Sequence, residues 1–188
     1  MANDPFRHRR GETPFVTLET ARLYINALTP EEFLREKTNA ARGEGFPDAM
    51  EELAERARHD RKRRFAWYTN RLIFRKEDNA YIGSIALMNS PEKDPDRLGL
   101  VEIGYETLPE YRCQGYMTEA VSALCDWALA QPKVYGMIAG VLDGNDASVR
   151  VLQKCGFVLT DHSERLHLQV WKKIPDGRRP MTWRERLF

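Results

Sequence analysis

Apolar and polar residues alternate over several short stretches of the chain, and this period of two predicts β-strands. The pattern is clear in residues 22–28, where Leu23, Ile25 and Ala27 occupy every second position. Runs of aromatic and β-branched residues predict further strands at 65–75, 81–88, 100–108, 134–142, 157–160 and 167–174. A short turn at 77–79 makes the first two of these a β-hairpin.

Other segments carry the helical period. Residues 117–129 have apolar positions three and four apart, which predicts an amphipathic helix. Residues 145–155 predict a shorter helix that Asn145 caps and Gly156 ends. Residues 29–32, Thr-Pro-Glu-Glu, form a capping box that starts another helix, and a further helix is expected at 48–59.

The strand at 100–108, the helix at 117–129 and the strand at 134–142 form a β-α-β unit, so the two strands should be parallel. The hairpins elsewhere make the sheet mixed. We therefore expect one three-layer domain of mixed α/β (α+β) class at 17–174, with a leader at 1–16 and a basic tail at 175–188.

The composition excludes several classes of protein. The 188 residues include 29 basic and 28 acidic ones, a net charge of +1, which argues against a dedicated nucleic-acid binder. At 42% hydrophobic, the chain can form a core. Its three cysteines have no C-x-x-C spacing, so we expect neither a disulfide framework nor a metal site. No apolar run reaches the length of a membrane span, and we expect a soluble, cytoplasmic protein.

The candidate chemistry lies in the turn at 111–118, between a strand and a helix. The first amides of a helix lack acceptors within the helix, and a turn there can present several of them to a phosphate. Gly115 permits close approach and Arg112 adds a cation. An ordinary strand-to-helix turn that contains a glycine is the alternative.

Several motifs in order resemble the GNAT superfamily of acyl-CoA N-acyltransferases. Residues 112–117, Arg-Cys-Gln-Gly-Tyr-Met, match its signature [Q/R]-x-x-G-x-[G/A] except at Met117. The ribosomal-protein N-terminal acetyltransferase branch is similar at 18–23, 102–105, 108–111, 118–120, 145–148 and 154–157. The resemblance covers about residues 17–174. It implies a mostly antiparallel mixed sheet, splayed at its central strands, with helices on both faces.

The resemblance also implies acetyl-CoA as co-substrate and a set of binding groups. The pantetheine arm would pair with the backbone of Tyr105, Glu106 and Thr107, and with Asn145. The pyrophosphate would be held by Arg112 and by the amides of Gln114, Gly115, Tyr116, Met117 and Thr118. For Asn145, a plain helix cap is the alternative.

The implied reaction is direct attack of a primary amine on the thioester. Deprotonating a lysine amine near pH 7.4 costs about 4 kcal/mol, against under about 1 kcal/mol for an α-amine. Glu102 is the candidate base, directly or through water, and Glu106 is the alternative on the same strand face. Ser148 is the candidate acid, and Tyr116 and Tyr135 are other hydroxyls that can serve.

These features predict an N-acetyltransferase that acts on a protein N-terminus or a small-molecule amine. A non-catalytic acyl-CoA-binding module and a ribosome- or RNA-associated protein are the alternatives. We interpret the basic run at 56–64 as the solvated end of a helix rather than as an RNA contact. The sequence context of His167 and Cys155 favours structural roles for both, and Cys113, beside the phosphate turn, is a candidate site for alkylation. The oligomeric state is left open, a homodimer included.

Overall fold

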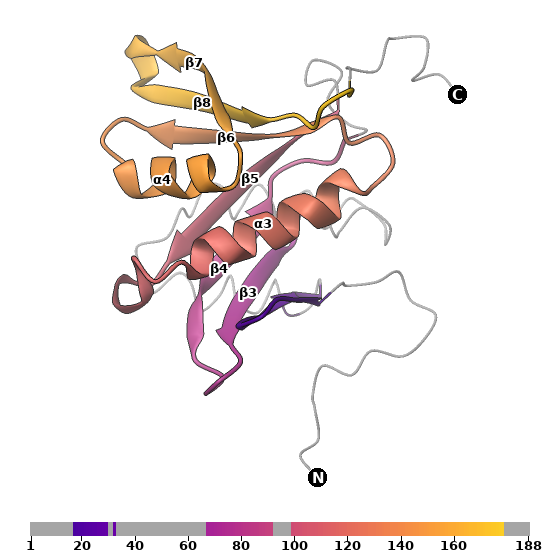
Figure 1. Ribbon diagram of the computed structural model, residues 1–188, viewed down its shortest axis with the longest axis vertical. Helices are drawn as coiled ribbons and strands as arrows, with labels where there is room; N and C mark the ends of the chain where they lie inside the picture. The colour runs from indigo at the N-terminus through magenta and orange to yellow at the C-terminus, as the bar shows by residue number, and fades with distance from the viewer. Residues whose placement is uncertain (1–16, 30–31, 33–66, 92–98, 179–188) are drawn as a thin grey trace.

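The computed structural model describes residues 17–29, 32, 67–91 and 99–178. In these residues, eight strands form one sheet in the order β1-β2-β3-β4-β5-β6-β8-β7 (Figure 1). The strands are β1 (Leu18–Glu19), β2 (Leu23–Ala27), β3 (Asn70–Arg75), β4 (Tyr81–Leu87), β5 (Leu100–Thr107), β6 (Gly136–Leu142), β7 (Val158–Ser163) and β8 (Leu168–Lys173). The helices are α3 (Tyr116–Leu129) and α4 (Asp146–Lys154), with 3-10 turns η2 (Pro109–Tyr111) and η3 (Glu164–Leu166).

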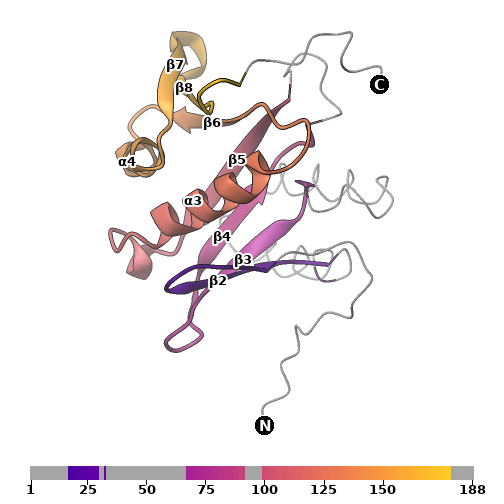
Figure 2. The same ribbon diagram turned by 45° about the vertical axis from the view of Figure 1, so that its right-hand side comes forward.

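The pairing of the strands confirms a mixed sheet. β5 and β6 are parallel, and every other neighbouring pair is antiparallel. α3 makes the crossover between β5 and β6, as the β-α-β pattern predicted (Figure 2). The predicted mixed α/β class is therefore confirmed.

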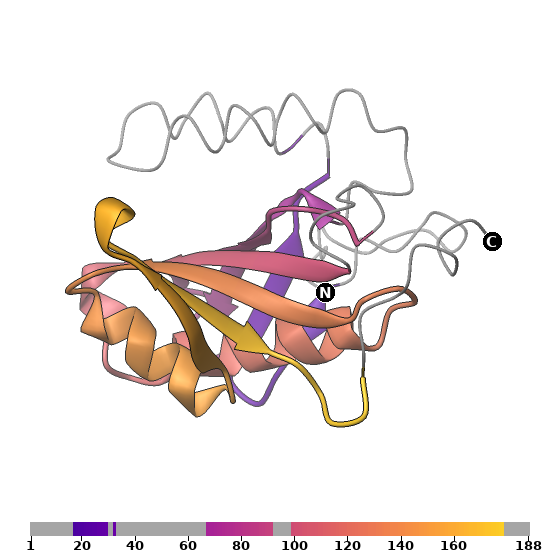
Figure 3. The ribbon, with the colours of Figure 1, turned by 90° about the horizontal axis from the view of Figure 1, so that it is seen from above.

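Both described helices lie on one face of the sheet (Figure 3). The apolar stripe of α3, which includes Ala120, Val121 and Leu124, is fully buried there. Alternate residues of β5 join the same core, with Val101 and Ile103 buried. Side chains on a strand alternate between faces, so the even-numbered residues of β5 point to the opposite face. The strand periodicity thus decides which β5 residues can meet the helices.

The first strand of the hairpin is shorter than the pattern predicted, because it begins at Asn70 rather than at residue 65. Its partner β2 ends at Ala27, which pairs with Arg71. The pairing of β3 with β2 therefore stops at Arg71, and the described residues 67–69 do not continue the strand. Instead, the buried Thr69 donates its hydroxyl to the Leu28 carbonyl at 2.6 Å.

The predicted capping box is present after β2. The Thr29 amide donates to Glu32 Oε2 at 2.8 Å, and the Glu32 amide donates to Thr29 Oγ1 at 3.2 Å. The rest of that helix, the expected helix at 48–59, the basic run at 56–64 and the leader lie outside the described residues. None of the helices in the described segments combines the length and apolarity needed to span a membrane.

Candidate functional site

Within the described residues, the turn between β5 and α3 leaves backbone donors without partners. Gly115 caps α3 in the left-handed conformation, with φ of 81°, and no side chain of the described segments caps the helix. The amides of Tyr116, Met117 and Thr118 precede the first intrahelical bond, in which the Glu119 amide donates to the Gly115 carbonyl. A Cβ on Gly115 would have one neighbour within 4 Å, the Arg22 Nη2 atom at 3.5 Å. The turn is therefore an open cradle for an anion at the positive end of a helix.

The departure from the family signature does not obstruct this cradle. The Met117 side chain is 5% exposed and packs in the core. Tyr116 is also buried, and its hydroxyl accepts a hydrogen bond from Arg75 Nη1 at 3.3 Å. The two side chains after the glycine thus anchor the first turn of α3 to the sheet, and their amides remain at the helix end.

The strands on either side of α3 separate beside this turn. β5 and β6 pair at three positions only, Leu100 with Gly136, Val101 with Met137 and Glu102 with Ile138. Beyond these positions, β5 continues along β4 while β6 continues along β8. The ends of the two strands diverge in Figure 1. The sheet therefore has the splayed central strands that the resemblance implies.

Backbone groups of β5 face the gap between the diverging strands. The Met88 amide donates to the Glu102 carbonyl at 2.8 Å, so the even-numbered residues of β5 bond with the β4 side. The backbones of Tyr105 and Thr107 are consequently directed to the β6 side. The backbone groups of Glu106 point the other way, because this residue bonds with β4 and does not face the gap.

The Arg112 side chain contacts the end of β5 at the edge that faces the gap. Its Nε donates to the Thr107 carbonyl at 3.1 Å, so the side chain bends back along β5. The guanidinium thereby joins the end of the strand to the start of the turn. Gln114 is held similarly, since its Nε2 donates to the Glu110 carbonyl at 2.9 Å. Both side chains fix the path of the turn.

α4 begins at two predicted residues, Asn145 and Ser148, and the second contacts β5. Asn145 caps this helix, accepting the Ser148 amide on Oδ1 at 3.1 Å. Its Nδ2 amide remains a donor that the cap does not use. The Tyr105 hydroxyl donates to the Ser148 carbonyl at 3.3 Å. Burial raises the pKa of Tyr105 to about 12, so this phenol keeps its proton at neutral pH and acts as a donor.

The two candidate bases lie on the face of the sheet opposite α3. Glu102 is half-buried, and its backbone amide donates to the Asn89 Oδ1 atom at 2.7 Å. Glu106 is exposed, and its Oε1 accepts the Ser84 hydroxyl at 3.1 Å. Ser148 and Glu102 therefore approach the sheet from opposite sides. The resemblance implies an acceptor side formed by residues 28–64 and by the strands at 160–175, and of the first segment residues 30–31 and 33–64 lie outside the described residues.

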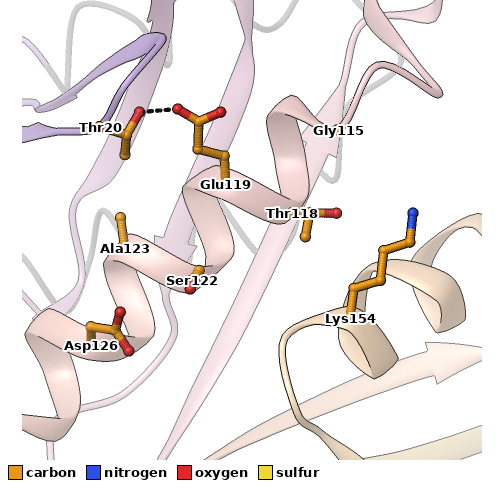
Figure 4. Close-up of a pocket in the computed structure, with 8 residues that line it drawn as sticks. All are labelled: Thr20, Gly115, Thr118, Glu119, Ser122, Ala123, Asp126 and Lys154. Carbon is orange, nitrogen blue, oxygen red and sulfur yellow. Dashed lines mark hydrogen bonds between the residues drawn. The ribbon is translucent and has the colours of Figure 1, made fainter.

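An open groove of about 500 Å³ continues from the turn along α3. Thr118, Ser122 and Asp126 line it on the helix, at spacings that place them on one face. Lys154 extends from α4 at the side of the groove, beside Thr118 (Figure 4). The remaining lining residues are Thr20, Gly115, Glu119 and Ala123. Next to the anion cradle, the groove offers hydroxyls, one lysine and the two carboxylates of Glu119 and Asp126.

Other candidates from the sequence lie elsewhere. Tyr135 precedes β6 and bonds the Gly99 carbonyl through its amide, at the closed end of the gap. His167 is 79% exposed, and its Nδ1 lies 3.7 Å from the Asp143 carboxylate. Cys113 is exposed, whereas Cys155 is buried. In the described segments, no group of His, Cys, Asp and Glu side chains could hold a metal ion.

Sequence reasoning missed three side chains at this site. It considered only the backbone of Tyr105, although the alternation of β5 already placed that ring on the helix face. Lys154 and Arg22 were noted as parts of motifs without a role. Arg22 lies beside the cradle, where its Nη1 donates to the Gln114 carbonyl at 3.2 Å.

Comparisons with known proteins agree with this geometry. A family described as the acetyltransferase (GNAT) domain matches residues 16–158. The uncharacterized N-acetyltransferase YjdG of Bacillus subtilis (strain 168) is 33% identical over 92 residues, which cover 49% of this chain and 52% of that protein. The probable N-acetyltransferase YjcK of the same organism is 32% identical over 114 residues, covering 61% and 58%. The match thus spans little more than half the length of these curated relatives.

A solved structure with the same fold is the ribosomal-protein-S5-alanine acetyltransferase from Vibrio fischeri. It superposes with a TM-score of 0.62 at 20% identity, over 88% of this chain and 100% of that one. At this identity, the likeness concerns the fold.

Proposed function

We propose, on the premise that this chain belongs to the GNAT acetyltransferase family, that it transfers an acetyl group from acetyl-CoA to a primary amine. The observation that carries the proposal is the uncapped turn at Gly115, which lies where β5 and β6 separate. An anion cradle and a gap for an extended arm then lie side by side, as a nucleotide thioester requires.

Acetyl-CoA fits the groups that are present. The amides of Tyr116, Met117 and Thr118 would hold the pyrophosphate at the start of α3. The arm would enter between β5 and β6, where the backbone of Tyr105 can pair with its amides. Asn145 would donate its Nδ2 amide to the same arm.

The groove along α3 would take the adenosine end of the co-substrate. It begins at Gly115, so a nucleotide whose pyrophosphate lies in the cradle can continue along it. Lys154 is the cation on its lining and would bind the 3′-phosphate. Thr118 and Ser122 supply hydroxyls along the same face.

The chemistry would proceed in one ternary complex. The amine nitrogen attacks the thioester carbon, and its proton passes to Glu102, directly or through a water molecule. The carbon–sulfur bond then breaks, and Ser148 donates a hydrogen bond to the departing thiolate. The Tyr105 hydroxyl keeps its proton and donates a hydrogen bond to the Ser148 carbonyl, so it holds the backbone of Ser148 in place. Glu102 and Ser148 come from opposite faces, so the amine and the thiolate can lie on different sides of the gap.

The acceptor would be a peptide N-terminus or a small-molecule amine. An α-amine loses its proton near pH 8, so it needs far less help from a base than a lysine amine with a pKa of about 10.4. A single carboxylate on the acceptor face is sufficient for such a substrate. Glu102 is the last residue of β5 that pairs with β6, so it lies where the gap begins, and this position favours it over Glu106.

The test is release of free coenzyme A thiol from acetyl-CoA in the presence of a panel of N-terminal peptides and small amines. We expect amine-dependent release, with the acetyl group found on the acceptor by mass spectrometry. Binding of acetyl-CoA without release for any acceptor would instead indicate a non-catalytic acyl-CoA-binding module. Absence of binding would refute the proposal.

A further inference from the structure

A carboxylate lies in the first turn of α3, close to the proposed pyrophosphate cradle. Glu119 lines the groove that begins at Gly115. An ionised carboxylate suits the positive end of a helix, but it repels an anionic ligand bound at that end. The protein therefore needs a means to offset the charge of Glu119.

Both carboxylate oxygens of Glu119 are held by the segment just before β2. Oε1 accepts the Thr20 hydroxyl and the Arg22 amide, the latter at 2.9 Å. Oε2 accepts Arg22 Nε at 2.7 Å. Partial burial acts to raise the pKa of Glu119, but the hydrogen bonds from Thr20 and Arg22 outweigh it and lower that pKa. Glu119 is thus ionised at neutral pH and paired with Arg22.

Arg22 also contacts the turn itself. Its Nη1 donates to the Gln114 carbonyl at 3.2 Å, and its guanidinium lies 4.5 Å from the centre of the Tyr116 ring. Its Nη2 is the atom nearest to a Cβ placed on Gly115. One guanidinium therefore touches the residues before and after the glycine, together with the carboxylate one turn later.

We propose that Arg22 is a positioning residue for co-substrate binding, which neutralises Glu119 and fixes the turn so that the cradle accepts a diphosphate. This inference rests on the proposed function. It assigns to the segment before β2 a role in a site whose binding groups belong to α3. Without the Arg22 guanidinium, the charge of Glu119 would face the ligand held by two neutral donors of the described segment, the Thr20 hydroxyl and the backbone amide of residue 22.

The experiment measures the dissociation constant of coenzyme A by calorimetry for the wild type and four variants. Arg22→Gln should weaken binding about five-fold, the size typical of a half-exposed charge contact. Lys76→Gln is the matched control. It also removes one positive charge, because Lys76, in the turn after β3, pairs with Glu19 of β1, and it should change binding by less than about two-fold. Glu119→Gln should bind at least as tightly as the wild type.

The double variant Arg22→Gln/Glu119→Gln is decisive. If Arg22 acts by neutralising Glu119, the double variant should recover most of the affinity that Arg22→Gln loses. In turnover assays, Arg22→Gln should raise KM for acetyl-CoA and leave kcat within about two-fold, because the reacting groups are untouched. A double variant as weak as Arg22→Gln would overturn the proposal, and so would unchanged binding in Arg22→Gln.

Two further outcomes are distinguished from these: failure of Arg22→Gln to fold, and failure of the wild type to bind coenzyme A. Should Arg22→Gln not fold, as seen by circular dichroism, Arg22→Lys carries the test. This variant keeps the charge beside Glu119 but not the guanidinium fork that also reaches the Gln114 carbonyl, so it should bind about two- to three-fold more weakly than the wild type, whereas a loss of about five-fold or more would overturn the neutralising role. A wild type that does not bind coenzyme A would refute the proposed function, and this inference with it. If the wild type binds coenzyme A and Arg22→Gln binds it equally well, this inference alone is refuted.

Discussion

A tryptophan at Gly115 should abolish acetyl-CoA binding without unfolding the protein. The backbone there has φ of 81°, so any L-residue is strained by roughly 1–2 kcal/mol. Gly177 provides a matched control, because its φ is 75° and a Cβ on it would meet nothing within 4 Å. It lies after β8, and its neighbour Arg178 donates to the Val134 carbonyl beyond the C-terminal end of α3, whereas Gly115 lies at the N-terminal end of that helix. Gly115→Trp and Gly177→Trp therefore share the backbone strain but not the contact with the proposed ligand.

The magnitudes follow from stability linkage and suit a thermal unfolding assay. In a chain of this size, about 1 kcal/mol corresponds to a shift in Tm of roughly 2–4 °C, so each variant should melt about 2–8 °C below the wild type. Acetyl-CoA at 100 times its Kd stabilises the native state by about 2.7 kcal/mol, which raises Tm by roughly 5–11 °C. Gly177→Trp should keep this rise and Gly115→Trp should lose it. An equal rise in both variants would show that the turn does not bind the co-substrate.

Four other results are expected. With an α-amine acceptor, Glu102→Gln should lower kcat about ten-fold at pH 7, with recovery above about pH 8 as the amine loses its proton unaided. Glu106→Gln should lower kcat less than about three-fold. A pH-independent activity ratio would remove Glu102 as the base. Asn145→Ala should lower the free energy of unfolding by about 1 kcal/mol and weaken coenzyme A binding. Asn145→Asp keeps the acceptor for the Ser148 amide, so it should weaken coenzyme A binding without lowering the free energy of unfolding. Equal affinity in Asn145→Asp and the wild type would show that Asn145 is a helix cap only. Lys154→Gln should erase the preference of the wild type for acetyl-CoA over its 3′-dephospho form, and Lys76→Gln should keep it; a preference that survives in Lys154→Gln would place the 3′-phosphate elsewhere. Burial raises the pKa of Cys125 from 9.0 to about 12, so the contribution of this thiol to stability is fully present below about pH 9 and is lost as the pH rises toward 12. The urea midpoint of Cys125→Ala should therefore fall less steeply than that of the wild type between about pH 8.5 and 10.5. An unchanged slope would contradict the burial argument.

Local sequence determined the elements of this protein because each depends on neighbours within a few positions. The alternation at residues 22–28 is sufficient for β2, and the Thr29–Glu32 capping box forms the two hydrogen bonds that its spacing predicts. Asn145 and Gly156 mark the ends of α4 for the same reason, the first by its side-chain oxygen and the second by a φ of 81°. The anion cradle at Gly115 is also a local feature, since it needs only a helix start and a residue that tolerates a positive φ.

Tertiary structure alone decided how these elements make a site. Arg22 and Glu119 are 97 residues apart, and no periodicity in the chain connects them. The separation of β5 from β6 after Glu102 depends on which neighbour each strand follows, and the pairing of β8 with β6 settles it. The hydrogen bond from Tyr105 to α4 and the placement of Glu102 on the other face have the same origin. Periodicity determines what a segment becomes, but the partners of a segment are chosen by packing across the whole chain, where many registers satisfy the same local pattern.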